Sequence, residues 1–244
     1  MPWKHIQDNP GSDNVTFNSN ATALSVGAFG SAVSLLNSVV VCVGGAGSSS
    51  GSISGLTVTD NGSTPNTYTQ AIIKTSSSTG AWVAFYVSRI TSNPSSGNLN
   101  PKVTVTNSQS LGIVASEFSG AASKSSVIND GNGASSTSNS TSPAPGAVTP
   151  TVYEDLVLTA EVNINATISA SPTGFTSVGK RSNSLFISME FMYKILNVSN
   201  LNSVSSTWTV GSSLWVACAY ILKPDPYPAS YVDSPMFPKA ITRM

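Results

Sequence analysis

The sequence predicts an all-β protein: an antiparallel, jelly-roll-like β-sandwich with extended N- and C-terminal arms. Apolar and polar residues alternate along many short segments, which is the period of a half-buried strand. Clusters of Gly, Pro, Asn and Ser separate these segments at short intervals. No segment combines a 3.6-residue period with the end caps of a helix. The pattern gives roughly eight to ten strands, the number expected of a double-sheet sandwich.

The elements follow in chain order from an extended arm at residues 1–14, which are polar and interrupted by Pro and Gly. A single sandwich domain is expected over residues 15–223, because segments with the sequence pattern of β-strands recur through this whole range. Uninterrupted runs of apolar and β-branched residues predict strands that are covered on both faces. These runs lie at 37–45, 80–90 and 213–223.

The stretch LTVTDNGSTPNTYTQAI, residues 56–72, predicts two strands joined as a hairpin. Asp60 and Asn61 offer oxygen ligands to Ca²⁺, but calcium sites use six to eight oxygens, several of them from carboxylates. Asp, Asn and Gly favour turn conformations, so we interpret Asp-Asn-Gly as the turn. Residues 119–149 are of low complexity and predict a long irregular loop inside the domain. Residues 224–244 predict a proline-rich C-terminal arm.

The composition excludes several classes of function. Charged residues make up 9% of the chain, against about 25% in an average globular protein. Lys plus Arg equals Asp plus Glu, 11 each, so no basic field attracts nucleic acid. No apolar run reaches the roughly 18 residues of a membrane-spanning helix, and no signal peptide is evident at the start. We expect no nucleic-acid partner, no membrane association and no cofactor.

Candidate catalytic and metal-binding residues are few. One histidine, His5, and two cysteines, Cys42 and Cys218, do not make a zinc site. The cysteines lie in apolar runs and are expected as buried thiols; a disulfide between them stays open as an alternative. His5 in the arm is expected as a solvated or docking residue rather than a catalytic one. We therefore predict neither a metal site nor an enzyme.

Three glutamates fall within predicted strands, Glu117, Glu161 and Glu190. A pair of them would suit a glycosidase-like mechanism, in which two carboxyl groups flank the bond that is cut. The interpretation that we favour is structural, with partners among Arg89, Lys194 and backbone amides, because a buried carboxyl group must be hydrogen-bonded or paired. No internal repeat of 20–50 residues is evident.

The two arms carry aromatic and large apolar side chains among their prolines. Disordered tails usually contain few aromatic residues. Stiffened segments with aromatic anchors lose little entropy on docking, and the anchors can fill pockets on a neighbour. The residues expected to dock on a partner are Trp3, Ile6, Tyr227, Tyr231, Met236 and Phe237.

The sequence resembles a β-sandwich module of bacterial surface proteins and phage virion proteins. The resemblance rests on LTVTDNGSTPNTYTQAI, WVAFYVSRI, KVTVTNS, LGIVASEFSG and the closing LWVACAYIL, and it covers Val15 to Lys223. The hairpin departs from the module's usual form, because DNGSTPNTY contains extra residues, including Pro65. The resemblance implies a jelly-roll-like fold without catalysis, and it supplies no set of functional residues.

The module occurs in phage virion proteins and in bacterial surface proteins, and these two contexts give two hypotheses. The chain begins at a methionine, carries arms at both ends and is poor in charge, which is similar to a capsid decoration, or cement, protein of a tailed phage. We therefore expect a virion structural protein on the capsid exterior, bound to the major capsid protein and to itself as a homotrimer. The alternative is a carbohydrate-binding or host-attachment module of a phage fibre or tail, or of a bacterial surface protein, with Trp82 or Trp208 facing outward.

Overall fold

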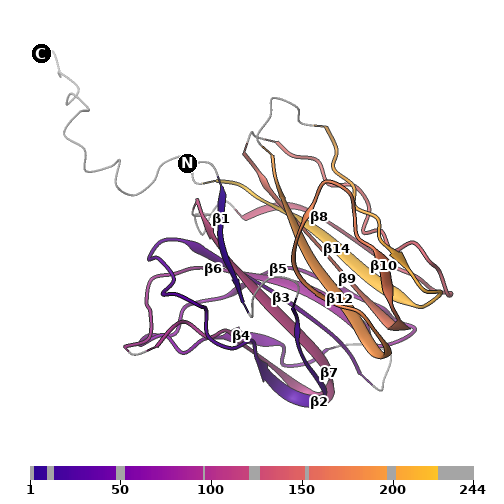
Figure 1. Ribbon diagram of the computed structural model, residues 1–244, viewed down its shortest axis with the longest axis horizontal. Helices are drawn as coiled ribbons and strands as arrows, with labels where there is room; N and C mark the ends of the chain where they lie inside the picture. Colours follow the sequence, from indigo (N-terminus) through magenta and orange to yellow (C-terminus); the bar gives the residue numbers. More distant parts are fainter. Residues whose placement is uncertain are drawn as a thin grey trace, which may run out of the picture.

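A computed structural model of the chain describes residues 3–9, 14–47, 53–95, 97–120, 127–151, 154–196 and 202–224, with the backbone alone for 127–130. All elements within these ranges are strands and loops, and none is a helix. Two antiparallel sheets pack face to face (Figure 1). The predicted all-β sandwich is therefore confirmed. In the same ranges, no helix has the length and hydropathy needed to span a membrane.

The first sheet comes from the first half of the chain. Its described strands lie in the spatial order β1-β7-β3-β6-β5, and β2 and β4 also pair with β7. The long β7 reaches beyond its central neighbours, which is why it can hold both additional strands along its first half. The bounds are β1 Lys4–Asn9, β2 Thr16–Ser25, β3 Ser38–Ala46, β4 Thr57–Thr59, β5 Thr69–Thr75, β6 Ala81–Arg89 and β7 Lys102–Ser119.

The second sheet comes from the second half, in the order β11-β12-β9-β14-β8, with the short β10 and β13 paired to each other. The chain thus completes one sheet before it starts the other, whereas the chain of a jelly roll passes back and forth between its sheets. The bounds are β8 Val127–Ser135, β9 Leu156–Ala166, β10 Ile168–Ala170, β11 Thr176–Arg181, β12 Asn183–Ile195, β13 Thr209–Val210 and β14 Trp215–Leu222.

The central strands are buried on both faces, as their uninterrupted apolar runs predict. Inward residues such as Cys42, Phe85 and Phe191 form the core between the sheets. The outer face of the first sheet is covered by loop residues that include Phe29 and Leu99. The outer face of the second sheet is covered in the same way, by loops that carry Val148, Val204 and Trp208. Because this cover comes from the chain itself, strands that are apolar on both sides do not require a sister subunit.

The two halves repeat one topology. When β1, β3, β5, β6 and β7 are matched with β8, β9, β11, β12 and β14, the spatial orders of the two sheets are identical. The pairing of β4 with the start of β7 corresponds to the pairing of β10 with β13, which precedes β14. The repeated unit is about half of the chain, which lies outside the range of 20–50 residues in which no sequence repeat is evident.

Local irregularities repeat as well. Leu36 and Glu154 both have a left-handed backbone, with φ of 72° and 69°, and each lies two residues before a central strand. The backbone N–H of each donates to the residue after the paired strand, Leu36 to Ile90 O and Glu154 to Leu196 O, both at 2.8 Å. Strands β5 and β11 carry a bulge at the same place. Such details do not recur by chance in two unrelated sheets, so the chain is a structural duplication.

The N-terminal segment is not an arm over residues 4–9. These residues form β1, which pairs with the end of β7 despite its polar sequence. Trp3 anchors the strand: its side chain is 3% exposed, its ring meets Phe118 edge-on, and its Nε1 donates to Leu222 O at 3.2 Å. The burial of one tryptophan and the ladder bonds explain why the polar residues that follow are held in the sheet.

The expected long irregular loop at 119–149 is also wrong in part, because β8 lies within it and pairs with β14. The sequence of β8, VINDGNGAS, lacks alternation because its strand lies at a crowded edge. A Cβ atom on Gly131 would lie 2.8 Å from the Tyr220 ring and 2.9 Å from Ile72 of the other sheet. Small residues are thus required where the two sheets approach each other, and they mimic the composition of a loop.

Candidate functional site

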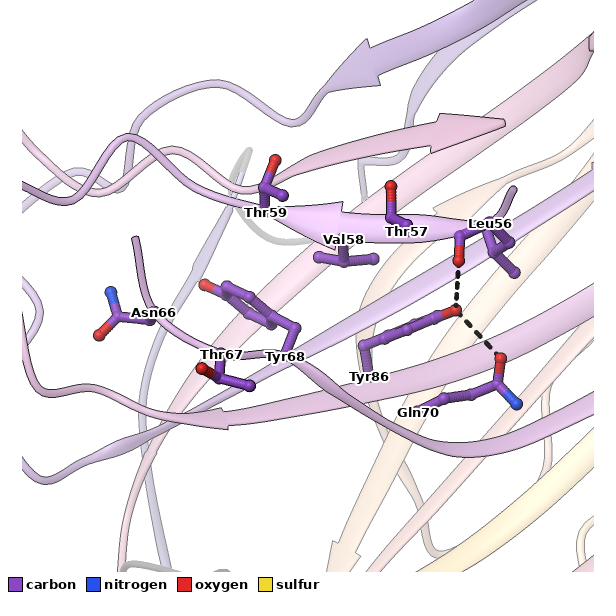
Figure 2. A pocket seen from close by; sticks show the side chains of 9 residues that line it. All are labelled: Leu56, Thr57, Val58, Thr59, Asn66, Thr67, Tyr68, Gln70 and Tyr86. Atoms are coloured by element: carbon purple, nitrogen blue, oxygen red, sulfur yellow. Dashed lines mark hydrogen bonds between the residues drawn. The ribbon is translucent and has the colours of Figure 1, made fainter. Parts of the chain in front are cut away.

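A groove of about 530 Å³ lies on the first sheet, between β4 and the segment that leads into β5 (Figure 2). It is formed by the stretch that predicted a hairpin, together with Tyr86 from β6. Its size is within the range of small-molecule sites, roughly 300–1,000 Å³. The lining residues are Leu56, Thr57, Val58, Thr59, Asn66, Thr67, Tyr68, Gln70 and Tyr86.

The predicted hairpin is wrong, and its absence creates the groove. Strand β4 pairs with β7 and β5 pairs with β6, so the two strands of the stretch do not pair with each other. A hairpin would bring the two strands to hydrogen-bonding distance and close the space between them. Because β4 follows another partner, a gap wide enough for a ligand stays between β4 and residues 66–70.

Asp60 and Asn66 hold the loop that links the two strands. The Asp60 carboxylate accepts hydrogen bonds from Gly62 N at 2.9 Å, Asn66 N at 3.3 Å and Asn66 Nδ2 at 2.8 Å. The Asn66 Oδ1 accepts from the backbone N–H groups of Thr91 and Ser92. Asp60 therefore shapes the turn, as its residue type predicts, and Asn66 ties that turn to the loop after β6.

Two tyrosines line the groove, and Figure 2 shows Val58 pointing toward both rings. The Tyr86 hydroxyl is within hydrogen-bond distance of Gln70 Oε1 at 3.0 Å and Leu56 O at 3.3 Å, so one proton serves these two acceptors. Burial raises the pKa of Tyr86 to about 12, which keeps that donor protonated. The Gln70 side chain is exposed, and none of the described residues accepts a hydrogen bond from its amide nitrogen.

The Tyr68 hydroxyl is buried but makes no hydrogen bond of ordinary geometry with the described residues. Burial raises the pKa of Tyr68 well above its usual range, and the charge of the nearby Asp60 carboxylate and a hydrogen-bonding interaction with it add to the shift. Asp60 also accepts three hydrogen bonds from other donors, so the phenol shares this carboxylate with them. A buried hydroxyl without a well-aligned partner is costly.

The residues expected to dock on a partner differ in where the structure places them. Trp3 lies inside the domain, which corrects its interpretation as a docking anchor: it cannot reach a partner without leaving the core. Ile6 is 42% exposed on β1 and is available for contact. The remaining four lie outside the described residues: Tyr227, Tyr231, Met236 and Phe237.

The tryptophans proposed as outward sugar platforms are wrong. Trp82 and Trp208 are fully buried. The Nε1 of Trp82 donates to Gln109 Oε1 at 2.6 Å, and the Nε1 of Trp208 donates to Glu190 Oε2 at 2.8 Å. The Trp82 ring lies under the loops that cover the outer face of the first sheet, and Trp208 lies in a loop that covers the outer face of the second.

The strand glutamates are buried structural groups. Glu117 accepts hydrogen bonds from Gln7, the backbone N–H of Ser34 and Asn37, so it ties β1 to the turn before β3. Glu161 and Glu190 lie opposite each other on neighbouring strands and are at most 1% exposed. Neither lines the groove. A glycosidase needs its carboxyl groups on either side of a substrate, whereas these two carboxyl groups accept hydrogen bonds from Asn163, Ser171, Ser177 and Trp208.

The histidine does not complete a hydrolytic triad. His5 Nε2 is 2.8 Å from Asp8 Oδ1, and Ser116 Oγ donates to that same oxygen at 2.6 Å. The aspartate thus lies between the serine and the histidine, whereas catalysis requires the histidine in the middle. Within the described ranges, no three His, Cys, Asp or Glu side chains gather where they could hold a metal ion. Both cysteines are free and buried.

No family model, no curated protein and no solved structure matches the chain. The resemblance to the phage and bacterial surface module therefore stays a prediction. What the described residues define is a duplicated β-sandwich with an uncharged, aromatic groove on its first sheet. Sequence reasoning singled out the groove's segment but weighed it as a cation loop, a sugar loop or a turn, and it did not select Tyr68, Gln70 or Tyr86.

Proposed function

We propose that the protein is a virion structural protein, a capsid decoration protein that stabilises the head of a tailed phage from outside. The observation that carries the proposal is a set of exposed aliphatic side chains at one end of the sandwich. Ile6, Leu35 and Leu36 are 42%, 57% and 47% exposed. Large apolar residues gathered at a surface favour contact with another protein.

These side chains belong to neighbouring elements. Ile6 lies at the bulge of β1, between the pairs of His5 and Gln7 with β7. Gln7 from β1 and Ser34 and Asn37 from the turn before β3 all donate to Glu117, which brings Ile6 and the two leucines to the same end.

The fold itself does not require a leucine at position 36. The equivalent residue of the second half is Glu154, which adopts the same left-handed backbone with a charged side chain. An aliphatic side chain that is exposed, and held in a backbone that disfavours it, is better explained by a partner than by folding.

The described chain also ends near β1. Strand β14 ends at Leu222, whose carbonyl accepts the Trp3 hydrogen bond beside β1, and residues 225–244 follow Pro224 in the sequence. The aromatic and proline residues of this segment would add contacts to those of Ile6, Leu35 and Leu36. Many modest contacts, repeated over copies of the protein, give tight attachment to the major capsid protein and to sister subunits of a homotrimer.

The test is cosedimentation with capsids assembled from the major capsid protein of the same phage. A variant ending at Pro224 and a variant with Leu35→Asp and Leu36→Asp should bind at least tenfold more weakly than the full chain and keep its melting temperature. Leu185→Asp is the matched control, because Leu185 is 73% exposed but lies at the other end of the second sheet. Equal binding of all four proteins, or no binding by the full chain, would refute the proposal.

A second candidate is an attachment module that binds carbohydrate on a host surface. The groove between β4 and Tyr68 is the observation that favours it, because its lining is uncharged and contains aromatic and amide groups. The two candidates use different surfaces and are compatible in one protein.

A further inference from the structure

We propose that the groove between β4 and Tyr68 binds a neutral carbohydrate, with Tyr68 and Gln70 as its main polar contacts. The site is independent of the exposed aliphatic end, so it does not rest on capsid attachment. It gives the second candidate function a defined surface, a ligand class and named residues.

The first argument is the chemistry of the lining. None of the nine lining residues is charged. The Asp60 carboxylate, which lies beside Tyr68, accepts hydrogen bonds from Gly62 and Asn66 in the loop. A groove without charge offers no compensation for burying a phosphate, a carboxylate or an ammonium group. The ligand that suits it is polar but uncharged, which describes a neutral sugar.

The second argument is a pair of hydrogen-bonding groups that have capacity to spare. The Tyr68 hydroxyl is buried beside the Asp60 carboxylate without a hydrogen bond of ordinary geometry, and no described residue accepts a hydrogen bond from the Gln70 amide nitrogen. Gln70 is held in place at its other end, because its Oε1 is the acceptor for Tyr86. A preoriented amide and a phenol can together donate to and accept from sugar hydroxyl groups.

The third argument is the apolar surface between these groups. Figure 2 shows the Val58 side chain directed toward the Tyr68 and Tyr86 rings, while Thr57 and Thr59 point away. Val58 is 6% exposed and Tyr86 is 4% exposed, so together they form a firm floor. A sugar ring has C–H groups that pack on such surfaces while its hydroxyl groups reach the polar rim.

The duplication provides an internal comparison. The positions that correspond to Tyr68, Gln70 and Tyr86 in the second half are Phe175, Ser177 and Met192. Ser177 donates to the buried Glu190 rather than facing a groove. The fold therefore forms without the tyrosine–glutamine pair, and we infer that the first half keeps this chemistry for a ligand rather than for stability.

The experiment measures binding of neutral oligosaccharides to the full chain by saturation-transfer NMR and calorimetry. The panel consists of maltotriose, cellotriose, chitotriose, mannotriose and galactotriose, with sialyllactose as the anionic comparison. Tyr68→Phe and Gln70→Ala should each weaken binding of a neutral trisaccharide roughly three- to tenfold, the effect of one hydrogen bond. Tyr68→Phe carries little folding risk, because the second half has Phe at this position.

The matched control is Ser203→Ala, in the smaller groove of the second half, which should bind as tightly as the unaltered chain. The proposal is overturned if no neutral member of the panel binds, if sialyllactose binds more tightly than all of them, or if neither Tyr68→Phe nor Gln70→Ala weakens binding. Binding without capsid attachment, or the reverse, separates this proposal from the decoration hypothesis.

Discussion

Replacing Glu161 by glutamine tests how the second sheet accommodates two adjacent buried carboxyl groups. Glu161 lies opposite Glu190, and its carboxyl accepts hydrogen bonds only from Asn163 Nδ2 among the described residues, at 3.1 and 3.2 Å. The Glu190 carboxyl accepts more hydrogen bonds, from Ser171, Ser177 and Trp208. Burial raises the pKa of Glu161 well above its usual range; the Asn163 hydrogen bond opposes this, the Glu190 charge adds to it, and Lys180 opposes it.

The sign of the pH effect follows from the raised pKa. In the unfolded chain Glu161 loses its proton near its ordinary pKa, whereas in the folded chain it keeps the proton to higher pH. Its contribution to stability is therefore complete below the ordinary pKa and is lost as pH rises toward the folded pKa. The free energy of unfolding falls by about 1.4 kcal/mol per pH unit over that window. For a chain of this size, the loss corresponds to about 3–6 °C of melting temperature per unit.

Glu161→Gln keeps the shape of the protonated side chain and cannot ionise, so this fall should disappear. Urea unfolding of both proteins between pH 4.5 and 7.5 measures this fall, and the difference between them cancels the titration of groups that do not interact with Glu161. As pH rises, the free energy of unfolding of the variant should increase relative to that of the unaltered chain. Parallel stability curves across this range would show that Glu161 does not keep its proton in the folded state, and the reasoning would fail.

Three further outcomes are expected. Gly179→Ala should cost about 1–3 kcal/mol in urea unfolding, because its Cβ would collide with the backbone oxygen of Asn14; Gly30→Ala, with no atom within 4 Å, is the control. Phe191→Ala should cost about 3–5 kcal/mol, because its ring is buried against Phe85 with centroids 5.2 Å apart; Phe186→Ala, at a ring that is 43% exposed, should cost far less. Burial raises the pKa of both cysteine thiols, so Ellman's reagent should label them only after denaturation, and rapid labelling of the native protein would contradict their placement.

The sequence predicts those parts of the fold in which side-chain pattern and burial coincide. Strands β3, β6 and β14 are recognisable because both of their faces are covered, so apolar residues are continuous. Strand β1 is polar and is held by one buried tryptophan, and β8 is built from small residues that a crowded edge requires. In both cases the decisive neighbours are more than 50 residues away in the chain, so no local sequence pattern indicates them.

The groove was predictable only in part for the same reason. Tyr68 and Gln70 lie in a segment that the sequence predicts to be the second strand of a hairpin. Their relation to Val58 and Tyr86 depends on β4 pairing with β7 instead of β5. The duplication was hidden because equivalent positions conserve backbone geometry rather than residue type, as Leu36 and Glu154 illustrate.

The fusion of two equivalent halves in one chain frees the protein from a constraint that binds every symmetric homodimer. In a homodimer, each substitution appears twice, so a groove on one subunit must also appear on the other. Here a single gene encodes both halves, and their association needs no second molecule and no minimum concentration. One half can thus keep Tyr68 and Gln70 at its surface while the other places Glu161 and Glu190 under its loops, and each can change without altering its counterpart.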